Sequence, residues 1–355
     1  MNEKATGKLP LRAMLGLMLL FTCLACLPHA YYRFNPETRF RAGHFEAITT
    51  PGHKVAESDF ENKVAGDPQG SGNEPEQSRE TPKAEEVESK GNTALRAFPS
   101  PDFNMLILGI DARQNEPSRS DVMILANIDP QTRKVVLISI PRDTKVEIPG
   151  VGYTKINHAH FLGEIKGGNH AGTMASLQAA SNLLNCDIHC YVKVNFQGFK
   201  SFIDSIGGVD LELKEPVKLT FAGVTLPAET QKLDGDTALK LVRERFSLPD
   251  GDFGRQKLQY LVLQALAEKL LAPKYIPRIP ELITEVRHNV LDTNLTDTDA
   301  ISLAWMFKGI SSGDVTHLSI PGHPEYAFDP LVESEVYYWV PETDKAAGLL
   351  ATAGP

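Results

Sequence analysis

Cysteine is scarce in this chain: there are four in 355 residues, in the close pairs Cys23/Cys26 and Cys186/Cys190. Neither pair is followed by histidines at zinc-site spacing, and neither forms a redox CxxC motif beside a βαβ pattern. A thiol-based metal or redox centre is therefore not expected. Cys186 and Cys190 are compatible with a short disulfide outside the cytoplasm, but close spacing alone does not guarantee bridgeable geometry, so that pairing stays open.

Positive charge is also in short supply. The formal net charge is −9, and no block of six or more Lys or Arg occurs anywhere in the chain. That balance argues against a nucleic-acid-binding protein, because such proteins gain much of their affinity from contacts to phosphates. The chain is 42% hydrophobic and 8% aromatic, which at this length is enough to bury a sizeable core.

A long uncharged run begins at Ala13 and ends at Tyr32. About 20 apolar residues are needed for a helix to cross a bilayer, and tyrosines favour the bilayer interface. We therefore expect a short cytoplasmic tail at residues 1–12 and a single transmembrane helix at 13–32. A cleaved signal peptide is the alternative. Basic residues flank the run on both sides, so they determine its orientation only weakly.

Residues 33–98 are expected to form an extracytoplasmic linker. Above all after Thr49, this segment is rich in Glu, Lys, Gly, Ser, Pro and Asn. Such a composition buries too little apolar surface to offset the entropy of ordering the chain. The segment is typical of a disordered tether that holds a globular domain, residues 99–355, away from a membrane.

The globular part mixes short apolar segments with segments of helical periodicity. The apolar segments predict strands at 105–110, 122–129, 134–141, 190–196, 209–213 and 315–322. Helical periodicity predicts helices at 173–184, 199–208, 236–246, 255–271, 279–290 and 295–310. This mixture indicates an α/β fold, a layered mixed β-sheet flanked by helices on both faces.

Acidic and basic side chains follow the ends of the first three predicted strands. Asp111 follows the first strand and Asp121 begins the second, so a hairpin-like loop would bring the two carboxylates together. Two such groups suit Mg²⁺, which takes its other ligands from water and phosphate oxygens. Arg142 and Asp143 end the third strand on the same rim, where ligand sites in open α/β sheets lie. Surface salt bridges, which contribute little to stability, explain any single pair equally well.

Three arginines lie within the short stretch "LVRERFSLPDGDFGRQ", which holds a Pro/Asp/Gly loop. Arg243 and Arg245 can share a target only if their helix ends near them, because residues two apart on a helix point away from each other. Arg255 and Gln259, four apart, share one face at the start of the next helix, where anions bind well. With Arg119 and Arg142 from the strand ends, these groups predict a metal-assisted phosphate or pyrophosphate site.

Seven segments give the chain a resemblance to the LytR–CpsA–Psr family of cell-wall assembly proteins: "LILGIDAR", "RSDVMIL", "SIPRDT", "KINHAH", "VNFQGFKSFIDSIGGV", "LDGDTALKLVRERF" and "GDFGRQKLQ". The resemblance implies a phosphotransferase in the bacterial cell membrane, single-pass, with an extracytoplasmic catalytic domain at 99–355. Such enzymes move a glycopolymer, for example a teichoic acid or capsular polysaccharide, from a polyprenyl-pyrophosphate carrier to peptidoglycan. The implied partners are this lipid-linked donor, the peptidoglycan acceptor and membrane lipid, with no nucleic acid.

The resemblance also implies roles for individual residues. Asp111 and Asp121 would hold Mg²⁺, with Mn²⁺ as an alternative cofactor. Catalytic roles fall to Asp121 and three arginines, Arg142, Arg243 and Arg245. The residues implied to bind the pyrophosphate are Arg119, Arg142, Lys155, Arg243, Arg245, Arg255 and Gln259. The general base stays open between Asp121 and Asp143.

The chain departs from the family pattern at Leu258, where the family often has arginine, so one basic contact is expected to be missing. His158 and His160 are expected to be packing residues rather than a metal pair. Apolar residues in "YLVLQALAEKLL" line either a tunnel for the prenyl chain or an ordinary core, which helical spacing does not distinguish. Two alternative functions remain: hydrolysis of the pyrophosphate by water, and a non-catalytic membrane-tethered binder or regulator of lipid-linked glycans.

Overall fold

A computed structural model describes residue 40 and residues 46–52, 102–111, 117–272, 275, 278, 281, 284, 290–308, 310 and 312–353. The predicted tail at 1–12 and transmembrane helix at 13–32 lie outside the described residues, as does most of the predicted linker at 33–98. Across the described ranges, no helix combines the length and the apolar character needed to cross a bilayer.

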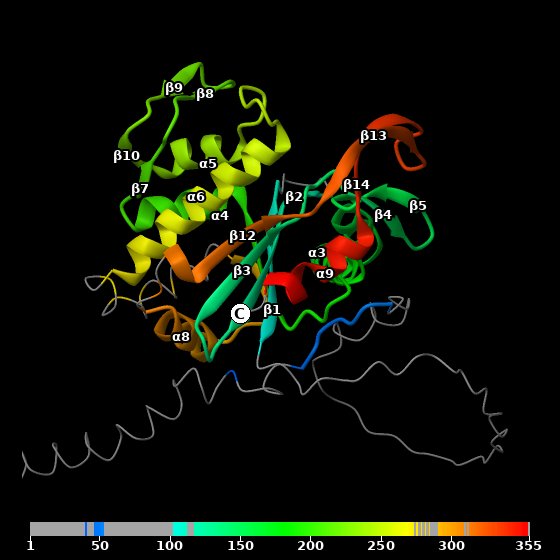
Figure 1. Cartoon of the computed structure of the whole chain (residues 1–355), viewed down its shortest axis with the longest axis horizontal. Helices are drawn as coiled ribbons and strands as arrows, with labels where there is room; N and C mark the ends of the chain where they lie inside the picture. The colour runs from blue at the N-terminus through cyan, green and yellow to red at the C-terminus, as the bar shows by residue number, and fades with distance from the viewer. Residues whose placement is uncertain are drawn as a thin grey trace, which may run out of the picture.

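A six-stranded mixed sheet forms the centre of the molecule (Figure 1). Its strands, in spatial order, are β11 (Val290–Thr293), β6 (Cys190–Asn195), β1 (Phe103–Ile110), β2 (Ser120–Asp129), β3 (Lys134–Ser139) and β12 (Val315–Ser319). β1 pairs with β6 in parallel and with β2 in antiparallel fashion. β12 pairs with β3 in parallel. The predicted strands at 105–110, 122–129 and 134–141 are confirmed to within two residues at each end.

The β1–β2 register decides where the first acidic residues lie. Ile110 is opposite Ser120, so Asp111, which follows β1, and Asp121, the second residue of β2, lie at the same end of the sheet. This is the hairpin-like arrangement expected from the sequence. The sequence of β1, "FNMLILGI", is almost entirely apolar, and the strand is almost continuously buried. Such a sequence suits a central strand, because its side chains are covered on both faces of the sheet.

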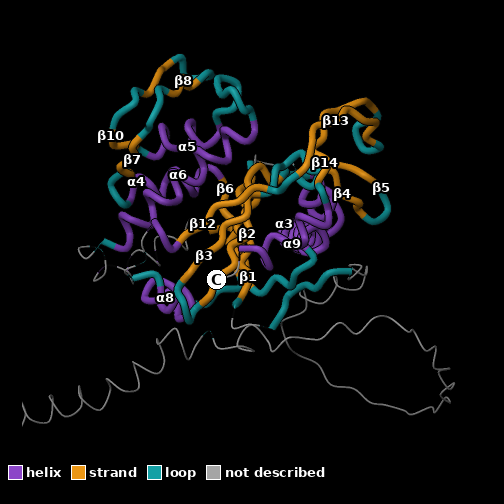
Figure 2. The backbone as a smooth tube through the Cα atoms, viewed as in Figure 1, coloured by secondary structure: helices purple, strands orange, loops and turns teal. Residues whose placement is uncertain are grey.

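Helices cover both faces of this sheet, which confirms the predicted layering (Figure 2). One core joins the sheet to α3 (His158–Leu184) and α9 (Thr343–Ala353), through Leu177 and Ala346 for example. On the other face, α8 (Asp297–Met306) buries Leu303 against the sheet. α6 (Asp252–Leu271) contacts β12 on that side, where the Tyr260 and His317 rings stack with centroids 4.6 Å apart.

A second core lies beside the sheet. α4 (Phe196–Ser205), α5 (Gly235–Arg243) and α6 pack there against two small antiparallel sheets of two strands each. One sheet pairs β7 (Val209–Glu212) with β10 (Thr230–Leu233), and the other pairs β8 (Val217–Leu219) with β9 (Val224–Leu226). Val262, Ala265 and Leu266 of α6 belong to this core. The apolar stretch of α6 that was compatible with a prenyl tunnel therefore contributes to packing.

Helix α3 begins fifteen residues before the predicted start at 173. Its first part, up to Gly167, and the part after Gly168 are separated by a kink at those two glycines, where Gly168 has φ +79°. Consecutive glycines and polar residues hid the helical pattern of this stretch. The predicted helix at 279–290 falls mainly on residues outside the described ranges.

Both described cysteines, Cys186 and Cys190, are free thiols, so the disulfide left open by their spacing is not formed. Burial raises the pKa of the Cys186 thiol to about 12, and that of Cys190 higher still. Neither thiol is activated as a nucleophile, because the thiolate is the reactive form.

A buried polar network joins the hairpin of β13 (Gly322–Asp329) and β14 (Ser334–Pro341) to the hairpin of β4 (Lys145–Ile148) and β5 (Gly152–Lys155). Asp329 Oδ2 accepts hydrogen bonds from Tyr338 Oη (2.7 Å) and Thr154 Oγ1 (2.8 Å). His158 Nδ1 lies 2.6 Å from Thr154 Oγ1. Burial is the main cause that lowers the pKa of His158 to about 4, so this histidine is neutral at physiological pH and acts in packing.

This network makes stability depend on pH. The pKa of His158 is about 4 when folded and about 6.5 when unfolded, so between these values the unfolded state binds more protons. The contribution of His158 to the free energy of unfolding should therefore be fully present above about pH 6.5 and should be lost as the pH falls towards 4. In urea denaturation, His158→Gln should show a shallower loss over this window than the wild type. His323→Gln, at an exposed position, is the control; equal slopes for all three proteins would contradict the assignment.

Candidate functional site

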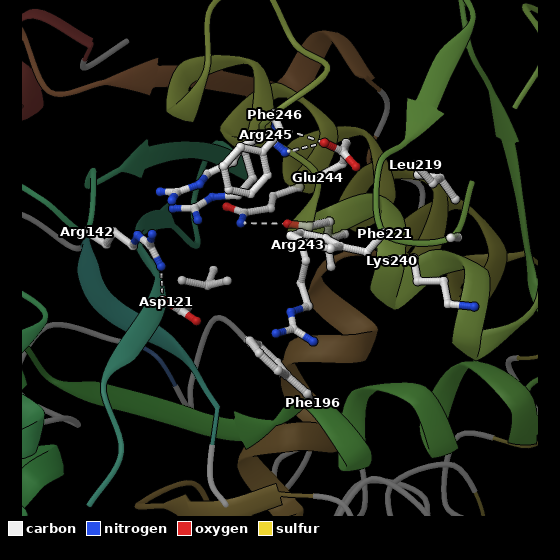
Figure 3. Close-up of a pocket in the computed structure, with 15 residues that line it drawn as sticks. Asp121, Arg142, Phe196, Leu219, Phe221, Lys240, Arg243, Glu244, Arg245 and Phe246 are labelled. Carbon is white, nitrogen blue, oxygen red and sulfur yellow. Dashed lines mark hydrogen bonds and ion pairs between the residues drawn. The ribbon is translucent and has the colours of Figure 1, made fainter. Parts of the chain in front are cut away.

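A pocket of about 470 Å³ lies between the end of the sheet and the helical region of α4, α5 and α6 (Figure 3). Side chains from the sheet, including Asp121 and Arg142, line it on one side, and Arg243 enters from the other. Both polar and apolar side chains line the pocket. The lining residues with charged or amide side chains are Asp121, Arg142, Lys240, Arg243, Glu244, Arg245, Arg255 and Gln259.

The sheet contributes a close ion pair. Asp121 is the second residue of β2, and Arg142 follows the end of β3 in a tight turn closed by the Thr144 N–H to the Pro141 carbonyl, 3.0 Å. Arg142 Nη1 donates to Asp121 Oδ1 at 2.6 Å. The pairing of neighbouring antiparallel strands β2 and β3 thus brings together two residues that are 21 positions apart in sequence.

Helix α5 ends at Arg243, three residues earlier than predicted, and the residue that ends it is Glu244. Its backbone is extended, and its buried carboxylate accepts hydrogen bonds from the N–H groups of Arg245 (3.0 Å), Phe246 (2.8 Å) and Ser247 (3.1 Å). The same carboxylate accepts from the Thr220 N–H at 2.5 Å. Glu244 therefore replaces the next helical turn by a fixed loop, and Arg243 and Arg245 both reach the pocket.

Aromatic rings support both of these arginines. The Arg243 guanidinium lies 4.6 Å from the centroid of the Phe196 ring, and that of Arg245 lies 4.8 Å from the Phe246 ring. Arg243 Nη2 is also 3.7 Å from Asp111 Oδ2. Stacking on a ring face orients a guanidinium while leaving its in-plane N–H groups available. The geometry suits recognition of an anion in the pocket.

The start of α6 provides Arg255 and Gln259 on one face, as predicted from their spacing. Both side chains are buried, with exposed fractions of 5% and 6%. Arg255 Nη2 pairs with Asp252 Oδ1 at 2.5 Å, and Gln259 Nε2 donates to the Val242 carbonyl at 3.1 Å. The Gln259 bond ties α6 to the last turn of α5, so the two arginine-bearing helix ends are held together.

The side chains that line the pocket carry more positive than negative charge, in contrast to the chain as a whole. Five cationic side chains and two carboxylates line the pocket, although the whole protein carries a net charge of −9. Burial lowers the pKa of Arg255, and repulsion from Arg142 and Arg245 lowers it further, against the opposing effect of Asp252. For Arg142, burial also works to lower the pKa, but Asp121 and Asp143 outweigh it and raise the value.

Two guanidinium nitrogens in this cluster are buried without a hydrogen-bond partner among the described residues: Nε of Arg142 and Nε of Arg255. Unpaired buried donors are costly, and charged ones more so. A multiply charged anion in the pocket would relieve the repulsion among the cationic side chains that line it. The arrangement can therefore bind and neutralise a group such as pyrophosphate.

Three predicted site residues do not line the pocket. Asp111 lies beside the pocket residue Arg243, with its Oδ2 3.7 Å from Arg243 Nη2. Lys155 Nζ pairs with Asp143 Oδ1 at 2.7 Å, and Asp143 in turn lies 3.8 Å from Arg142 Nε. Arg119 is exposed and stacks on the Phe161 ring at 4.9 Å. Within the described part of the chain, no group of three or more His, Cys, Asp or Glu side chains could hold a metal ion.

Sequence reasoning missed several residues of the site. Glu244 was not singled out, although an acidic residue between two arginines is a visible signal. Lys240 and the apolar wall of the pocket, Phe196, Leu219, Phe221 and Phe246, were not singled out. Leu258, which stands where the family often has arginine, is buried in the second core with Val262, so it provides no contact to the pocket.

Comparison with known proteins places this site in context. The LytR_cpsA_psr family model matches residues 69–353, beginning inside the segment predicted as linker. A Bacillus cereus relative, the polyisoprenyl-teichoic acid–peptidoglycan teichoic acid transferase TagU, is 35% identical over 269 residues, covering 74% of this chain and 82% of the relative. The TagU of Oceanobacillus iheyensis is 35% identical over 224 residues, covering 62% and 68% respectively.

Solved structures share the fold. Bacillus subtilis TagV is 30% identical, with a TM-score of 0.60, covering 71% of this chain and 96% of that one. A structure of TagT bound to LIIa-WTA is 27% identical, with a TM-score of 0.57, covering 71% and 89%. The central mixed sheet and its flanking helices are therefore those of solved relatives.

The crowded arginines predict that inorganic pyrophosphate with Mg²⁺ raises the melting temperature of the full-length chain in detergent, because a ligand that binds only the folded state stabilises it. Arg245→Ala should weaken the apparent affinity about tenfold or more, since a charged hydrogen bond is lost. Lys257→Ala is the matched control, because Lys257 lies on α6 with its side chain 65% exposed and paired to Asp250. No melting shift with the wild type, or equal shifts in both variants, would contradict anion binding here.

Proposed function

The chain belongs to the LytR_cpsA_psr family, and on that premise we propose that it is a phosphotransferase that moves a glycopolymer from a polyprenyl-pyrophosphate carrier to peptidoglycan. The relatives named as teichoic acid transferases support this activity, and teichoic acid is one candidate polymer. The observation that carries the proposal is the pocket lined by five cationic side chains.

In this proposal the arginines bind the pyrophosphate of the donor. Arg142 and Arg255 form the buried part of the site, and Arg243 and Arg245 close it from the end of α5. Guanidinium groups match phosphate oxygens bidentately. Phosphoryl transfer needs little covalent chemistry from the protein, so positioning and charge neutralisation by these fixed groups provide most of the rate.

The reaction is a displacement at phosphorus. An acceptor sugar hydroxyl attacks the phosphorus that bears the glycopolymer, and a new P–O bond forms. The P–O bond to the bridging oxygen breaks, and polyprenyl monophosphate leaves with the electron pair. The hydroxyl proton passes to a carboxylate: Asp121 lines the pocket whereas Asp143 does not, which favours Asp121 as the base.

A divalent cation fits the donor set of this site. Asp111 and Asp121 lie at the same end of the β1–β2 hairpin, and Mg²⁺ is typically bound by one or two carboxylates together with phosphate oxygens rather than by a complete protein cage. Asp111 and Asp121 would hold Mg²⁺, or Mn²⁺ in its place. When bound, the ion neutralises charge on the pyrophosphate.

The apolar wall of the pocket is proposed to receive the first part of the prenyl chain. Phe196, Leu219, Phe221 and Phe246 line the pocket beside the arginines, so a ligand with an anionic head and an apolar tail matches both walls. A membrane-bound carrier fits the single-pass extracytoplasmic arrangement expected for residues 13–32 and the domain after them. Transfer of glycopolymer is favoured over passive binding because the charged set includes a carboxylate, Asp121, beside the arginines that would bind the pyrophosphate.

Transfer is tested with the full-length chain in detergent, a polyprenyl-pyrophosphate-linked saccharide, Mg²⁺ and soluble peptidoglycan oligomers. Arg142→Ala and Asp121→Ala should each lower the transfer rate about 10²-fold or more, because each removes a fixed charge at the reacting group. Saccharide mass on the acceptor and release of polyprenyl monophosphate are measured together. Lys134→Ala, at the exposed opposite end of β3, is the control.

The paired readout separates the three functions. Release of carrier with no labelled acceptor would favour hydrolysis of the pyrophosphate. Binding of several saccharide donors without turnover would favour the membrane-tethered binder. Transfer by this pocket is supported only if the wild type labels the acceptor and both Arg142→Ala and Asp121→Ala lose this labelling.

Metal removal is a separate test. A chelator should abolish transfer, and Mg²⁺ or Mn²⁺ should restore it. Asp111→Asn and Asp121→Asn should raise the metal concentration needed for half-maximal rate about tenfold or more, since each removes a carboxylate ligand. Binding of Mn²⁺ in the presence of pyrophosphate, followed by electron paramagnetic resonance, gives a readout independent of activity. Asp250→Asn is the control, and full activity in chelator would show that the arginines alone neutralise the donor.

A further inference from the structure

The β13–β14 hairpin has one face made largely of aromatic side chains. In its register Tyr326 is opposite Tyr337 and Pro324 is opposite Trp339, and Phe328 follows two residues after Tyr326 on the same face. The Tyr326 and Tyr337 rings meet edge-to-face with centroids 5.8 Å apart. Tyr326 is 73% exposed and Phe328 is 62% exposed. Large aromatic side chains left in water on a regular strand mark an interaction surface.

The opposite face of the same hairpin is anchored in the protein. Tyr338 and Asp329 are fully buried and are hydrogen-bonded to each other and to Thr154. Asp329 Oδ1 also accepts from the backbone N–H groups of Leu331 and Val332, which fixes the turn. The aromatic face is therefore presented on a rigid support, which reduces the entropy lost on binding.

This aromatic face begins next to residues that adjoin the pocket lining in sequence. The Trp339 backbone N–H donates to the carbonyl of Asp143 at 2.9 Å, directly after the pocket residue Arg142. The Trp339 ring contacts Phe253 of α6, with centroids 4.6 Å apart, two residues before Arg255. Burial raises the pKa of Tyr337, and the nearby carboxylates of Asp143 and Asp252 add to this effect. The row Trp339, Tyr337, Tyr326 and Phe328 thus leads outward from the arginine cluster, along the hairpin that rises beside the sheet in Figure 1.

The charge of the hairpin limits what can occupy it. Residues 322–341 contain four carboxylates, Glu325, Asp329, Glu333 and Glu335, and no Lys or Arg. Asp329 is fully buried and Glu325 pairs with Lys145, so the lack of Lys and Arg on the hairpin is what limits its occupant. An anionic bilayer surface or a phosphate-rich polymer is recognised by such basic residues. Sugar rings, by contrast, combine an apolar C–H face with hydroxyl groups, and tyrosine and tryptophan combine a ring face with a polar tip.

We propose that the outward face of the β13–β14 hairpin, centred on Tyr326, Tyr337 and Phe328, is the subsite for the acceptor glycan strand. This inference rests on the proposed function and adds to it the surface that receives the acceptor. The donor is held by cationic side chains on one side of the pocket, and the acceptor approaches from the acidic, aromatic side. A glycan stacked along this row leads towards Arg142, whose partner Asp121 is the proposed base.

The test uses the full-length chain in detergent with Tyr326→Ala, Phe328→Ala and the double variant. Each lost ring contact should raise KM for the peptidoglycan oligomer about two- to tenfold, and the double variant more, with KM for the lipid-linked donor unchanged. Tyr326→Phe keeps the ring and should retain most of the acceptor affinity. Trp305→Ala is the matched control, since Trp305 is 52% exposed but lies on α8, at the far end of the molecule from the hairpin (Figure 1).

Two binding measurements accompany the kinetics. Co-sedimentation with purified peptidoglycan sacculi and titration with a hexamer of N-acetylglucosamine should both weaken in the double variant and not in Trp305→Ala. Co-sedimentation with vesicles containing anionic lipid should stay unchanged. Because the substituted side chains are exposed, loss of folding is not expected, and circular dichroism checks it.

The outcomes are distinct for the two proposals. Absence of transfer by the wild type with every acceptor would overturn the proposed function, while sacculus binding would still test the surface. Wild-type transfer with unchanged acceptor KM in the double variant would overturn the acceptor subsite alone. If the double variant loses binding to vesicles but keeps binding to sacculi, the aromatic face contacts membrane and not the glycan strand.

Discussion

Repulsion among closely held guanidinium groups is the constraint that organises this protein. Arg142, Arg245 and Arg255 come from three different elements and converge on one pocket, where burial and repulsion from Arg142 and Arg245 work against the charge of Arg255. Bringing unpaired charges together in a protein interior is costly unless they are compensated. Asp121 and Asp252 compensate part of this charge, and the remainder provides the attraction for an anionic donor.

The scaffold around the pocket fixes these groups before any ligand arrives. Glu244 ends α5, holds the following loop by three backbone N–H groups and also accepts from the Thr220 N–H. Gln259 ties that helix end to α6. On the other side, the buried network of Thr154, Asp329 and Tyr338 holds the β13–β14 hairpin to the protein. Fixed polar groups lose little free energy to reorganisation when charge develops on a substrate.

Charge is divided between the two sides of the proposed reaction centre. The pocket lining is cationic in a chain of net charge −9, and the adjacent hairpin is acidic and aromatic. Under the proposed function, a donor with a pyrophosphate group and an acceptor made of sugar rings would be directed to different surfaces.

Much of the fold and part of the site could be predicted from local sequence. Apolar runs located β1, β2 and β3, the spacing of Arg255 and Gln259 placed both on one helix face, and the "SLPDGD" loop placed the end of α5 near Arg243. The kinked start of α3 was missed because Gly167 and Gly168 interrupt its pattern. The β13–β14 hairpin was also missed, although the run "VYYWV" in β14 is typical of a strand.

What the sequence by itself determined is the set of charged groups and the layered α/β architecture, since both follow from residue types and short-range periodicity. Only the tertiary structure decided that Arg142 pairs with Asp121, that Lys155 reaches the site through Asp143, and that Arg119 stacks on Phe161 outside the pocket. The physical reason is that an ion pair or a stacked ring depends on distances between segments far apart in the chain. Strand register and helix packing set those distances, and local patterns do not contain them.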